Sequence, residues 1–443
     1  MTTDRRVFTR RDFIRIAATL GVGIVGYKLI RFNIPVSNVK ARIVIVGGGA
    51  AGISMAARLQ RALSDPDITL IDPSETHYYQ PGFTLIGCGV YDSSQVHKPE
   101  ASLIPGDVKW IKDYVVELDP DRNTVTTAQN GDIPYDFMVL CPGIQMHFEE
   151  IEGISRDKLG EGNVHCIYDY RSSQQCWAAI QELSQKGGRA VFTDTWTKLK
   201  CGGAPKKINM MAEDYSRQQG TRDKIDFQLF TASDKMFDVP LFCNRLEEIY
   251  AERQIPVTFE HKIRSVDTIE KKVCFEYGSG ENLKVVTSGF DFLHIVPPMS
   301  APDFVVQSEV AVNPVTGKRE SWVPTNKDTM VHARYSNIIV VGDVSGVPTS
   351  KTGAAIRMQV PVAVANLISV MEGSEPQEKY NGYTACPFAT EYGKVLMAEF
   401  GYDKVPAPSI PFVDPGIEHW IGWFLKTKML KPMYFQGMLR GIM

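Results

Sequence analysis

The hydrophobic pattern near the start of the chain predicts a strand, a tight turn, a helix and a second strand. Residues 41–46 (ARIVIV) are a short apolar run, typical of a strand buried on both faces of a parallel sheet. A glycine-rich turn follows at residues 47–52 (GGGAAG), and residues 53–63 place their apolar positions at helical spacing. Residues 67–72 (DITLID) are a second apolar run. This order predicts a dinucleotide-binding unit.

The glycines of the turn and the acidic end of the second strand suit a dinucleotide. Gly47, Gly49 and Gly52 let backbone N–H groups and the start of the helix approach a pyrophosphate without a Cβ in the way. Asp72 follows Gly52 by twenty residues, where a carboxylate can accept hydroxyls of an adenosine ribose. FAD and NAD share this opening, so later residues must distinguish them.

Two later strand-and-turn patterns favour FAD. Residues 135–143 (YDFMVLCPG) predict a strand that ends in a tight turn at Gly143, and residues 337–343 (NIIVVGD) predict another that ends at Gly342 and Asp343. In flavoproteins with two dinucleotide domains, the first turn closes the FAD domain and the Gly-Asp carboxylate holds the ribityl chain of the flavin. Together with the first turn, these residues predict one FAD site in a discontinuous domain.

A second nucleotide-binding domain is predicted, but without its motif. Residues 189–193 (RAVFT) have the pattern of its first strand, and DTWTKLKCGGAPKK follows where a G-x-G-x-x-G turn would cradle NAD(P)H. Trp196 and several lysines would fill the space of the pyrophosphate, so we expect a partner other than a nicotinamide. Cys201 lies in this segment, where nearby lysines and a helix start favour a thiolate. The alternative is a buried structural thiol.

The predicted fold class is α/β, with two tandem Rossmann-like dinucleotide-binding domains, the FAD domain being discontinuous, and a C-terminal membrane-interface region. The expected limits are 41–150 and 290–365 for the FAD-binding domain, 151–289 for the second domain and 366–443 for the C-terminal region.

Composition excludes some functions. The chain has 443 residues, 22% of them charged, and a formal net charge of -3, so it lacks the basic excess of nucleic-acid-binding proteins. Its eight cysteines are scattered without C-x-x-C spacing, which predicts no metal site. We expect most of them to be buried small hydrophobic residues.

The N-terminus has the features of a bacterial twin-arginine export signal. Arg10 and Arg11 stand in RRVFTRRDFIR, ahead of a moderately apolar stretch of about 15 residues, short for a span that needs roughly 20. Residues 1–40 are therefore predicted to be a signal or a possible anchor, and the alternative is an ordinary basic amphipathic helix.

The C-terminal residues 417–443 mix aromatic and apolar side chains with lysines. Pro432 is expected to divide them into two helical pieces too short to span a bilayer. Apolar faces edged with cations are typical of helices that lie in a membrane interface. The alternative is that these side chains cover the core of the protein itself.

From residue 41 onward the chain resembles the sulfide:quinone oxidoreductases, specifically the branch that includes the mitochondrial enzyme. The resemblance rests on VGGGAAGISMAARL, DPSETHYYQPGFTLIG, LKCGGAPKKI, HIVPPMSAPD, VVGDVSGVPTSKTGAA, GYTACPFATEYGKVLMAEFGY and LKPMYFQGMLRG, in this order. It implies an enzyme that oxidises hydrogen sulfide and passes electrons through FAD to a quinone.

The resemblance also implies roles for individual residues. Cys201 and Cys386 match the two redox cysteines of that branch, and hydrosulfide would attack their disulfide at Cys386 to leave a persulfide there. A thiol, sulfite or further sulfide would then accept the sulfane sulfur. Lys351, in PTSKTGAA, would lie near the pyrimidine edge of the flavin and stabilise its anionic reduced form.

The export signal is a departure from the mitochondrial branch. It predicts a peripheral, monotopic enzyme on the periplasmic side of the bacterial inner membrane, with the homo-oligomeric state left open. The main alternative is an exported flavin subunit of a sulfide dehydrogenase that passes electrons to cytochrome c. A non-catalytic flavin- or sulfur-binding protein and a nicotinamide-dependent disulfide reductase are weaker alternatives. Cys88 is a further thiol near the flavin domain, without a local motif for covalent attachment of FAD, so non-covalent FAD is expected and covalent attachment is the alternative.

Overall fold

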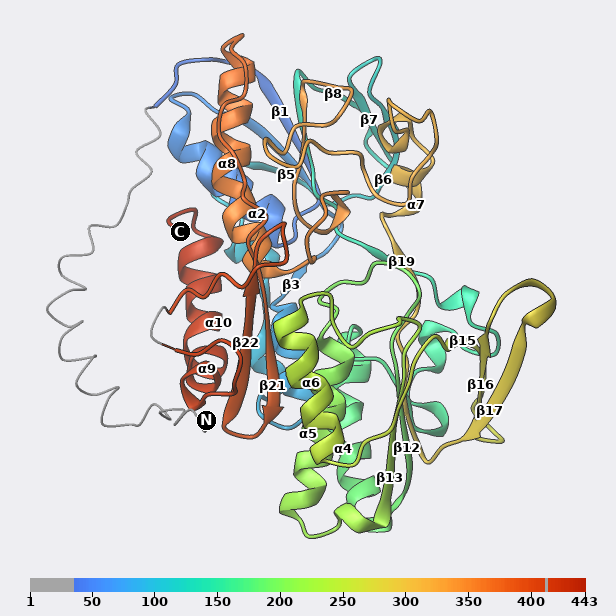
Figure 1. Ribbon diagram of the computed structural model, residues 1–443. Coiled ribbons are helices and arrows are strands. Elements are labelled where there is room, and N and C mark those ends of the chain that lie inside the picture. The colour runs from blue at the N-terminus through green and yellow to red at the C-terminus, as the bar shows by residue number, and fades with distance from the viewer. Residues whose placement is uncertain (1–35, 411–412) are drawn as a thin grey trace, which may run out of the picture.

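Two parallel sheets form the body of the molecule, and the C-terminal segment lies along one side of both (Figure 1). The computed structural model describes residues 36–410 and 413–443. The predicted twin-arginine signal lies almost wholly outside the described residues. Both sheets alternate with helices, which confirms the predicted α/β fold class.

The first sheet joins two distant parts of the chain. Its strands are all parallel, in the order β20-β9-β1-β2-β5. They are β1 (Arg42–Val46), β2 (Asp67–Ile71), β5 (Lys109–Ile111), β9 (Phe137–Leu140) and β20 (Ile338–Val340). Because β20 pairs with β9 across about 200 intervening residues, the FAD-type domain is discontinuous, as predicted.

Each face of the first sheet is covered by other elements. Helices α2 (Ala50–Ala62) and α8 (Gly353–Met371) pack against each other on one face, and a small antiparallel sheet lies on the other. The strands of that small sheet are β6 (Val115–Asp119), β7 (Thr124–Thr127) and β8 (Gly131–Pro134). Short elements complete this half: β3 (Thr76–Tyr78), β4 (His97–Pro99), α3 (Phe83–Gly87) and α7 (Asp303–Val306).

Among the described residues, α8 is the one helix long and apolar enough to cross a membrane, with a mean hydropathy of 1.5. Half of it is buried within the protein, where it packs on α2, as the core helix of a folded domain does.

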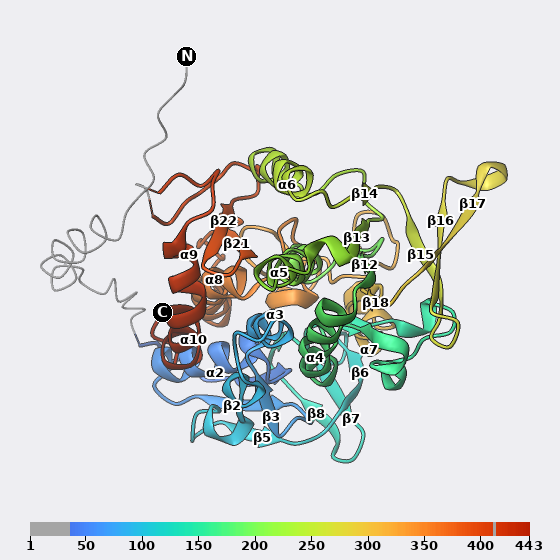
Figure 2. The ribbon, with the colours of Figure 1, turned by 90° about the horizontal axis from the view of Figure 1, so that it is seen from below.

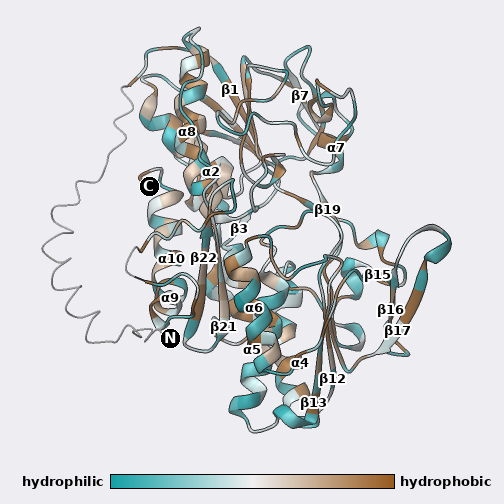
Figure 3. Cartoon of the chain, viewed as in Figure 1, coloured by the Kyte–Doolittle hydropathy of each residue, from teal (hydrophilic) through white to brown (hydrophobic). Residues whose placement is uncertain are grey.

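The second sheet has the order β11-β18-β12-β13-β14 and is also parallel. Its strands are β11 (Val164–His165), β12 (Gly188–Thr193), β13 (Ile225–Phe230), β14 (Val257–Thr258) and β18 (Phe292–His294). Its helices are α4 (Tyr170–Lys186), α5 (Ala204–Gln218) and α6 (Pro240–Glu252). Since β18 pairs with β12, this sheet extends beyond the limit expected at residue 289. The strands of both sheets are largely hydrophobic (Figure 3).

Two further antiparallel sheets lie outside the main parallel sheets. β10 (Gln145–Met146) pairs with β19 (Met299–Ser300) where the chain passes between the two halves. A three-stranded sheet, β15 (Lys262–Asp267), β16 (Lys272–Tyr277) and β17 (Lys284–Gly289), projects away from the body (Figure 2).

The C-terminal region is a hairpin followed by one continuous helix. The hairpin strands β21 (Thr384–Glu391) and β22 (Lys394–Phe400) pack against α5 and the helix α9, respectively. Helical backbone then runs through α9 (Trp420–Phe424), a π turn (Leu425–Met429), α10 (Leu430–Pro432) and a second π turn (Met433–Met438).

The expected break at Pro432 is therefore wrong. Pro432 itself has helical dihedrals, φ -56° and ψ -44°. Wider π turns flank it, and they relieve the clash between a proline ring and the carbonyl four residues earlier. On the inner face Tyr434, Phe435 and Leu439 join the core of the first domain, so the helix covers core as well as surface.

Candidate active site

The first glycine turn has the geometry that a pyrophosphate requires. Gly47 has φ +103°, and a Cβ there would lie 2.6 Å from the carbonyl oxygen of Cys141. A Cβ on Gly52 would lie 1.8 Å from the carbonyl oxygen of Gly47, so only glycine allows α2 to start this close to β1. A Cβ on Gly49 would meet nothing within 4 Å. The turn is tight on its inner side and open at Gly49, at the N-terminus of α2.

Asp72 lies directly beside this turn. Its Oδ2 accepts a 2.5 Å hydrogen bond from the N–H of Gly48, and its Oδ1 accepts one of 2.8 Å from Ser74. Burial raises the pKa of Asp72. Each carboxylate oxygen has two lone pairs, so both can still accept a hydroxyl. The ribose contact stays a prediction.

The other two predicted flavin positions close the same domain. Gly143 and Gly342 both have φ +82°, and Gly342 donates a 2.9 Å hydrogen bond to Gln359. Asp343 is buried, and its Oδ2 lies 2.5 Å from the Nζ of Lys200. Its Oδ1 has no hydrogen-bond partner among the described residues. A buried acceptor without a donor fits a hydroxyl-bearing ligand, which the ribityl chain of FAD would supply.

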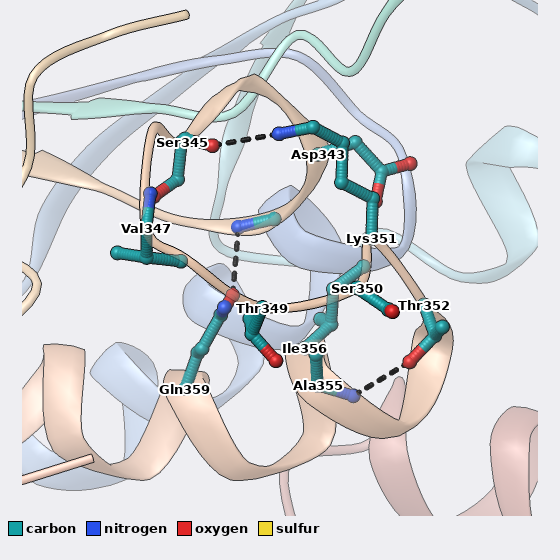
Figure 4. A pocket seen from close by; sticks show the side chains of 11 residues that line it. Asp343, Ser345, Val347, Thr349, Ser350, Lys351, Thr352, Ala355, Ile356 and Gln359 are labelled. Atoms are coloured by element: carbon teal, nitrogen blue, oxygen red, sulfur yellow. Dashed lines mark hydrogen bonds between the residues drawn. The ribbon is translucent and has the colours of Figure 1, made fainter. Parts of the chain in front are cut away.

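Lys351 lines a small pocket next to Asp343 (Figure 4). Its Nζ donates a 2.7 Å hydrogen bond to the carbonyl oxygen of Ser345 and lies 3.7 Å from the centre of the Trp322 ring. Burial lowers the pKa of Lys351 to about 7. The carbonyl oxygen of Lys351 accepts a 3.0 Å hydrogen bond from the N–H of Cys201. This backbone bond joins the flavin-domain loop to the cysteine loop.

Cys201 and Cys386 meet although 185 positions separate them, with their Sγ atoms 3.6 Å apart. Cys201 lies just before α5 in a left-handed conformation, φ +49°, which is unusual outside glycine. Cys386 is buried in β21. A Cβ on Gly203 would lie 2.7 Å from Cys386 Sγ, so the missing side chain permits the approach of the two thiols.

The surroundings of the two thiols shift their pKa values in opposite directions. Hydrogen bonding from Cys386 and the neighbouring Lys207, whose Nζ is 3.0 Å from Cys201 Sγ, hold the pKa of Cys201 well below its ordinary value. The pKa of Cys386 is raised by the hydrogen bond to Cys201 and by burial. Cys201 is therefore the more acidic of the two thiols.

Lys426 and Tyr168 also lie at this site, and the sequence did not indicate either. Lys426 comes from the C-terminal helix and is buried, and burial followed by repulsion from Lys207 lowers its pKa to about 8. Tyr168 donates a 3.3 Å hydrogen bond to the carbonyl oxygen of Cys201. A lysine among apolar residues in FLKTKML was the only local signal for Lys426.

A cluster of buried side chains lies where the second domain would need a glycine turn. At the carboxyl end of β12, Asp194 binds the Nζ of Lys206 at 3.0 Å and the hydroxyl of Thr231 at 2.7 Å. It also accepts the N–H of Ala232 at 2.9 Å. These groups satisfy one another and fill the edge of the sheet that binds phosphates in nucleotide-binding relatives of this fold.

Cys88 is buried in the hydrophobic cluster that also contains Cys386. Its thiol donates a 2.9 Å hydrogen bond to the carbonyl oxygen of Thr84, and burial raises its pKa to about 12. The raised pKa favours the neutral thiol over the nucleophilic thiolate. Within the described ranges, no group of three or more His, Cys, Asp or Glu residues could hold a metal ion.

A larger hollow opens beside the C-terminal helix, with an empty volume of about 640 Å³. It is lined by Val90, Tyr91, Gln95, Trp423, Thr427, Lys428 and Lys431. Tyr91 donates a 2.7 Å hydrogen bond to the carbonyl oxygen of Thr427, and the Nζ of Lys431 lies 4.5 Å from the centre of the Tyr91 ring. The exposed Phe424 and Met429 lie on the same helix.

Comparisons with known proteins agree with this geometry. Residues 41–192 match the family model described as pyridine nucleotide-disulphide oxidoreductase. The chain is 37% identical over 401 residues to the mitochondrial sulfide:quinone oxidoreductase of Dictyostelium discoideum. The aligned region covers 90% of this chain and 86% of the relative. The mitochondrial enzyme of Mus musculus is 35% identical over 405 residues, with the same shares.

A solved structure shows the same fold. The sulfide:quinone oxidoreductase from the hyperthermophilic bacterium Aquifex aeolicus superposes with a TM-score of 0.73 at 22% identity, covering 91% of this chain and 92% of that one. The level of identity to the two mitochondrial relatives, over most of both chains, decides the family. This chain is an FAD-binding enzyme that belongs to the sulfide:quinone oxidoreductase family.

Proposed function

We propose that the chain oxidises hydrogen sulfide with Cys201 and Cys386 as its redox pair and delivers the electrons to a membrane quinone. The approach of the two Sγ atoms to 3.6 Å is the observation that carries this proposal. A disulfide requires about 2.05 Å, so a shift of about 1.5 Å closes the bond. The names of the relatives support sulfide and quinone as the substrates.

The reaction begins with the oxidised pair. Hydrosulfide attacks Cys386 Sγ, a new S–S bond forms there, and the Cys201–Cys386 bond breaks to release Cys201 as a thiolate. Lys207, 3.0 Å from that sulfur, stabilises the leaving thiolate. An acceptor thiol, sulfite or a second sulfide then takes the sulfane sulfur from Cys386. Cys386 takes up one proton as the sulfane sulfur leaves. When the Cys201 thiolate and the Cys386 thiol re-form their disulfide, that proton and two electrons are released, and the electrons pass to the bound electron carrier.

The flavin-domain residues hold the electron carrier. FAD, when bound, accepts the two electrons and passes them to quinone. Gly47, Gly49 and Gly52 would cradle its pyrophosphate, Asp72 its ribose, and Gly143, Gly342 and Asp343 its flavin half. Lys351 places a cation beside Asp343, where it would stabilise negative charge on the reduced ring. The backbone bond from Cys201 to Lys351 keeps the cysteine loop against this loop.

The C-terminal region is proposed to dock on the membrane and admit the quinone. Phe424 and Met429 are exposed, and Lys428 and Lys431 line the hollow beside them. Apolar side chains next to cations are what an interfacial helix needs. We place the enzyme peripherally on the periplasmic side of the bacterial inner membrane, on the basis of the paired Arg10 and Arg11. Fractionation of cells after fusion of residues 1–40 to a reporter tests that location.

The proposed domain limits are 41–150 with 290–365 for FAD, 151–289 for the second domain and 366–443 for the C-terminal region. The strand β18 argues for moving the second limit to about residue 295, since it pairs within the second sheet.

Anaerobic mixing with sulfide tests the proposal. The flavin of the wild type should lose its absorbance near 450 nm, and Cys201→Ser or Cys386→Ser should abolish that loss. Cys274→Ser is the matched control, because Cys274 lies in the projecting sheet. Addition of decylubiquinone should restore the oxidised spectrum, whereas cytochrome c should not. Normal reduction in either variant, or reoxidation by cytochrome c alone, would contradict the proposal.

A further inference from the structure

A second buried carboxylate faces the glycine turn, in addition to Asp72. Glu100 follows β4 and is 2% exposed. A Cβ placed on Gly48 would lie 2.6 Å from Glu100 Oε1 and 2.9 Å from the Cβ of Asp72. The two acidic side chains therefore border the same side of Gly48.

Strand pairing brings Glu100 to this position. β3 and β4 are antiparallel with His77 opposite Lys98, and the N–H of Glu100 donates a 2.9 Å hydrogen bond to the carbonyl oxygen of Glu75. The side chain of Glu100 consequently turns toward His77, whose Nδ1 is 3.3 Å from Glu100 Oε2. Its backbone position is determined by the sheet, so the carboxylate is held in place.

The two oxygens of Glu100 differ in their partners. Oε2 has His77, whereas Oε1 has no hydrogen-bond partner within residues 36–410 and 413–443. Burial raises the pKa of Glu100, and the neighbouring Asp72 adds to the rise. A buried carboxylate oxygen without a donor is costly, by about 1–3 kcal/mol or more. The N–H of Gly48 does not serve it, because that group already donates to Asp72.

His77 is oriented in turn by the C-terminal helix. Its Nε2 lies 2.6 Å from the hydroxyl of Tyr434, which is buried. Because Nδ1 faces a carboxylate, the consistent assignment has Nδ1–H donating to Glu100 and Nε2 accepting from the Tyr434 hydroxyl. A line of polar contacts thus runs from Tyr434 of the C-terminal helix through His77 to the Glu100 carboxylate, which borders the glycine turn.

We propose that Glu100 is a second ribose-binding residue of the FAD site, with Oε1 accepting one adenosine hydroxyl beside Asp72. His77, itself bonded to Tyr434, holds Oε2. The adenosine ribose carries two adjacent hydroxyls, which suits two carboxylates that border one glycine. The hydroxyl supplies the donor that Oε1 lacks. The inference depends on FAD binding and is independent of the roles of the two cysteines.

Equilibrium titration of the full-length apoprotein, prepared by releasing FAD from the holoenzyme, tests this role. Three ligands are compared by flavin fluorescence: FAD, and FAD analogues that lack the 2′- or the 3′-hydroxyl of the adenosine ribose. Glu100→Ala should weaken FAD binding about 10–100-fold, the range for a hydrogen bond to a charged group. One of the two analogues lacks the hydroxyl that Glu100 binds. Glu100→Ala should change the affinity for that analogue by no more than about threefold, because the contact is already absent.

Controls separate binding from folding. Glu281→Ala removes an exposed carboxylate from the end of the projecting sheet and should leave all three affinities unchanged. Glu100→Gln keeps the shape of the side chain and replaces the alanine variant if that variant does not fold. Its affinity should fall several-fold for FAD and for the analogue that keeps the contacted hydroxyl, and not for the other analogue. Tyr434→Phe should produce a smaller loss with the same ligand dependence. An equal loss for FAD and both analogues, or no loss for FAD, would overturn the proposal.

Discussion

The Nζ of Lys207 lies 3.0 Å from the Sγ of Cys201, one turn into the helix that Cys201 precedes. Cys201 precedes the N-terminus of α5, and the first turn of this helix brings the side chain of Lys207, six residues later, back to the cysteine sulfur. The buried cation compensates the negative charge of a thiolate that is partly removed from water.

Replacing Lys207 with methionine should raise the pKa of Cys201. Cys386 and Lys207 both hold that pKa below its ordinary value, so loss of the cation removes one of the two causes. The expected rise is about 1–3 units. A higher pKa moves thiolate formation to higher pH, so alkylation of Cys201 at pH 7 should slow down. The pH profile of iodoacetamide labelling, assigned to Cys201 by mass spectrometry, measures the change.

Lys198→Met is the control for this prediction, because Lys198 is an exposed lysine of the same loop. Its labelling profile should match that of the wild type. An unchanged profile in Lys207→Met would show that the hydrogen bond from Cys386 alone keeps Cys201 ionised.

The local chemistry of the flavin domain was readable from the sequence, whereas contacts between distant segments were not. Gly47, Gly52 and Asp72 follow one another along a single strand-turn-helix-strand unit, so their spacing determines their geometry. Cys386 depends on a hairpin that packs on α5, and only the resemblance to a family indicated it. No local pattern marks Glu100 or Lys426, because burial of each depends on elements far along the chain.

The wrong expectation at Pro432 has a similar origin. A proline inside a helical pattern predicts a break when the turn is α-helical. The π turns before and after it depend on how the inner face, with Tyr434 and Phe435, packs onto the first domain. Tertiary packing therefore overrode the local preference.

Gly203→Ala should separate the two cysteines. The new Cβ would lie 2.4 Å from Cε1 of Phe388 and 2.7 Å from Cys386 Sγ, so β21 must move away from α5. We expect a loss of about 1–3 kcal/mol in the free energy of unfolding, as for other overpacked cores. Formation of the Cys201–Cys386 disulfide should slow as well. Chemical denaturation and the rate of thiol loss on oxidation measure the two effects.

The neighbouring glycine supplies a matched control. A Cβ on Gly202 would meet only Leu199, at 3.7 Å, which is ordinary van der Waals contact. Gly202→Ala should therefore keep both stability and disulfide formation close to the wild type. Equal behaviour of the two variants would contradict the steric argument.

Lys351→Met should lower the midpoint potential of the flavin in a pH-dependent way. With a pKa of about 7, Lys351 is largely cationic at pH 6 and largely neutral at pH 8. A cation stabilises the anionic reduced ring, so its removal should cost about 30–60 mV at pH 6, or about 1.4–2.8 kcal/mol for two electrons. The difference from the wild type should shrink as the pH rises, because the wild type loses the same charge. Redox titration at several pH values measures it.

Lys351→Arg tests the sign of this effect. Arginine stays charged throughout this range, so this variant should keep the higher potential at pH 8 as well. A gap between Lys351→Met and the wild type that is constant from pH 6 to 8 would rule out titration of Lys351 as its source.

Charges placed on the outer face of the C-terminal helix should release the protein from membranes. Phe424 and Met429 are 38% and 41% exposed, so Phe424→Asp and Met429→Asp also give up the packing of the buried part of each side chain. Each should cost about 1–2 kcal/mol of stability, less than the total stability of an ordinary domain. The exposed two-fifths of each side chain can enter lipid, which is worth about 0.6–1.2 kcal/mol, and the aspartate adds repulsion from anionic headgroups of about 1 kcal/mol. Flotation with vesicles that contain anionic lipid should therefore show at least a tenfold weaker association.

Ile269→Asp is the control for this prediction, because Ile269 is 89% exposed in the turn between β15 and β16 of the projecting sheet. This variant should bind vesicles as the wild type does. Deletion of the helix is a poorer test, because Tyr434 and Phe435 belong to the core of the first domain and their loss would unfold it. If both aspartate variants float like the wild type, the membrane contacts a different face.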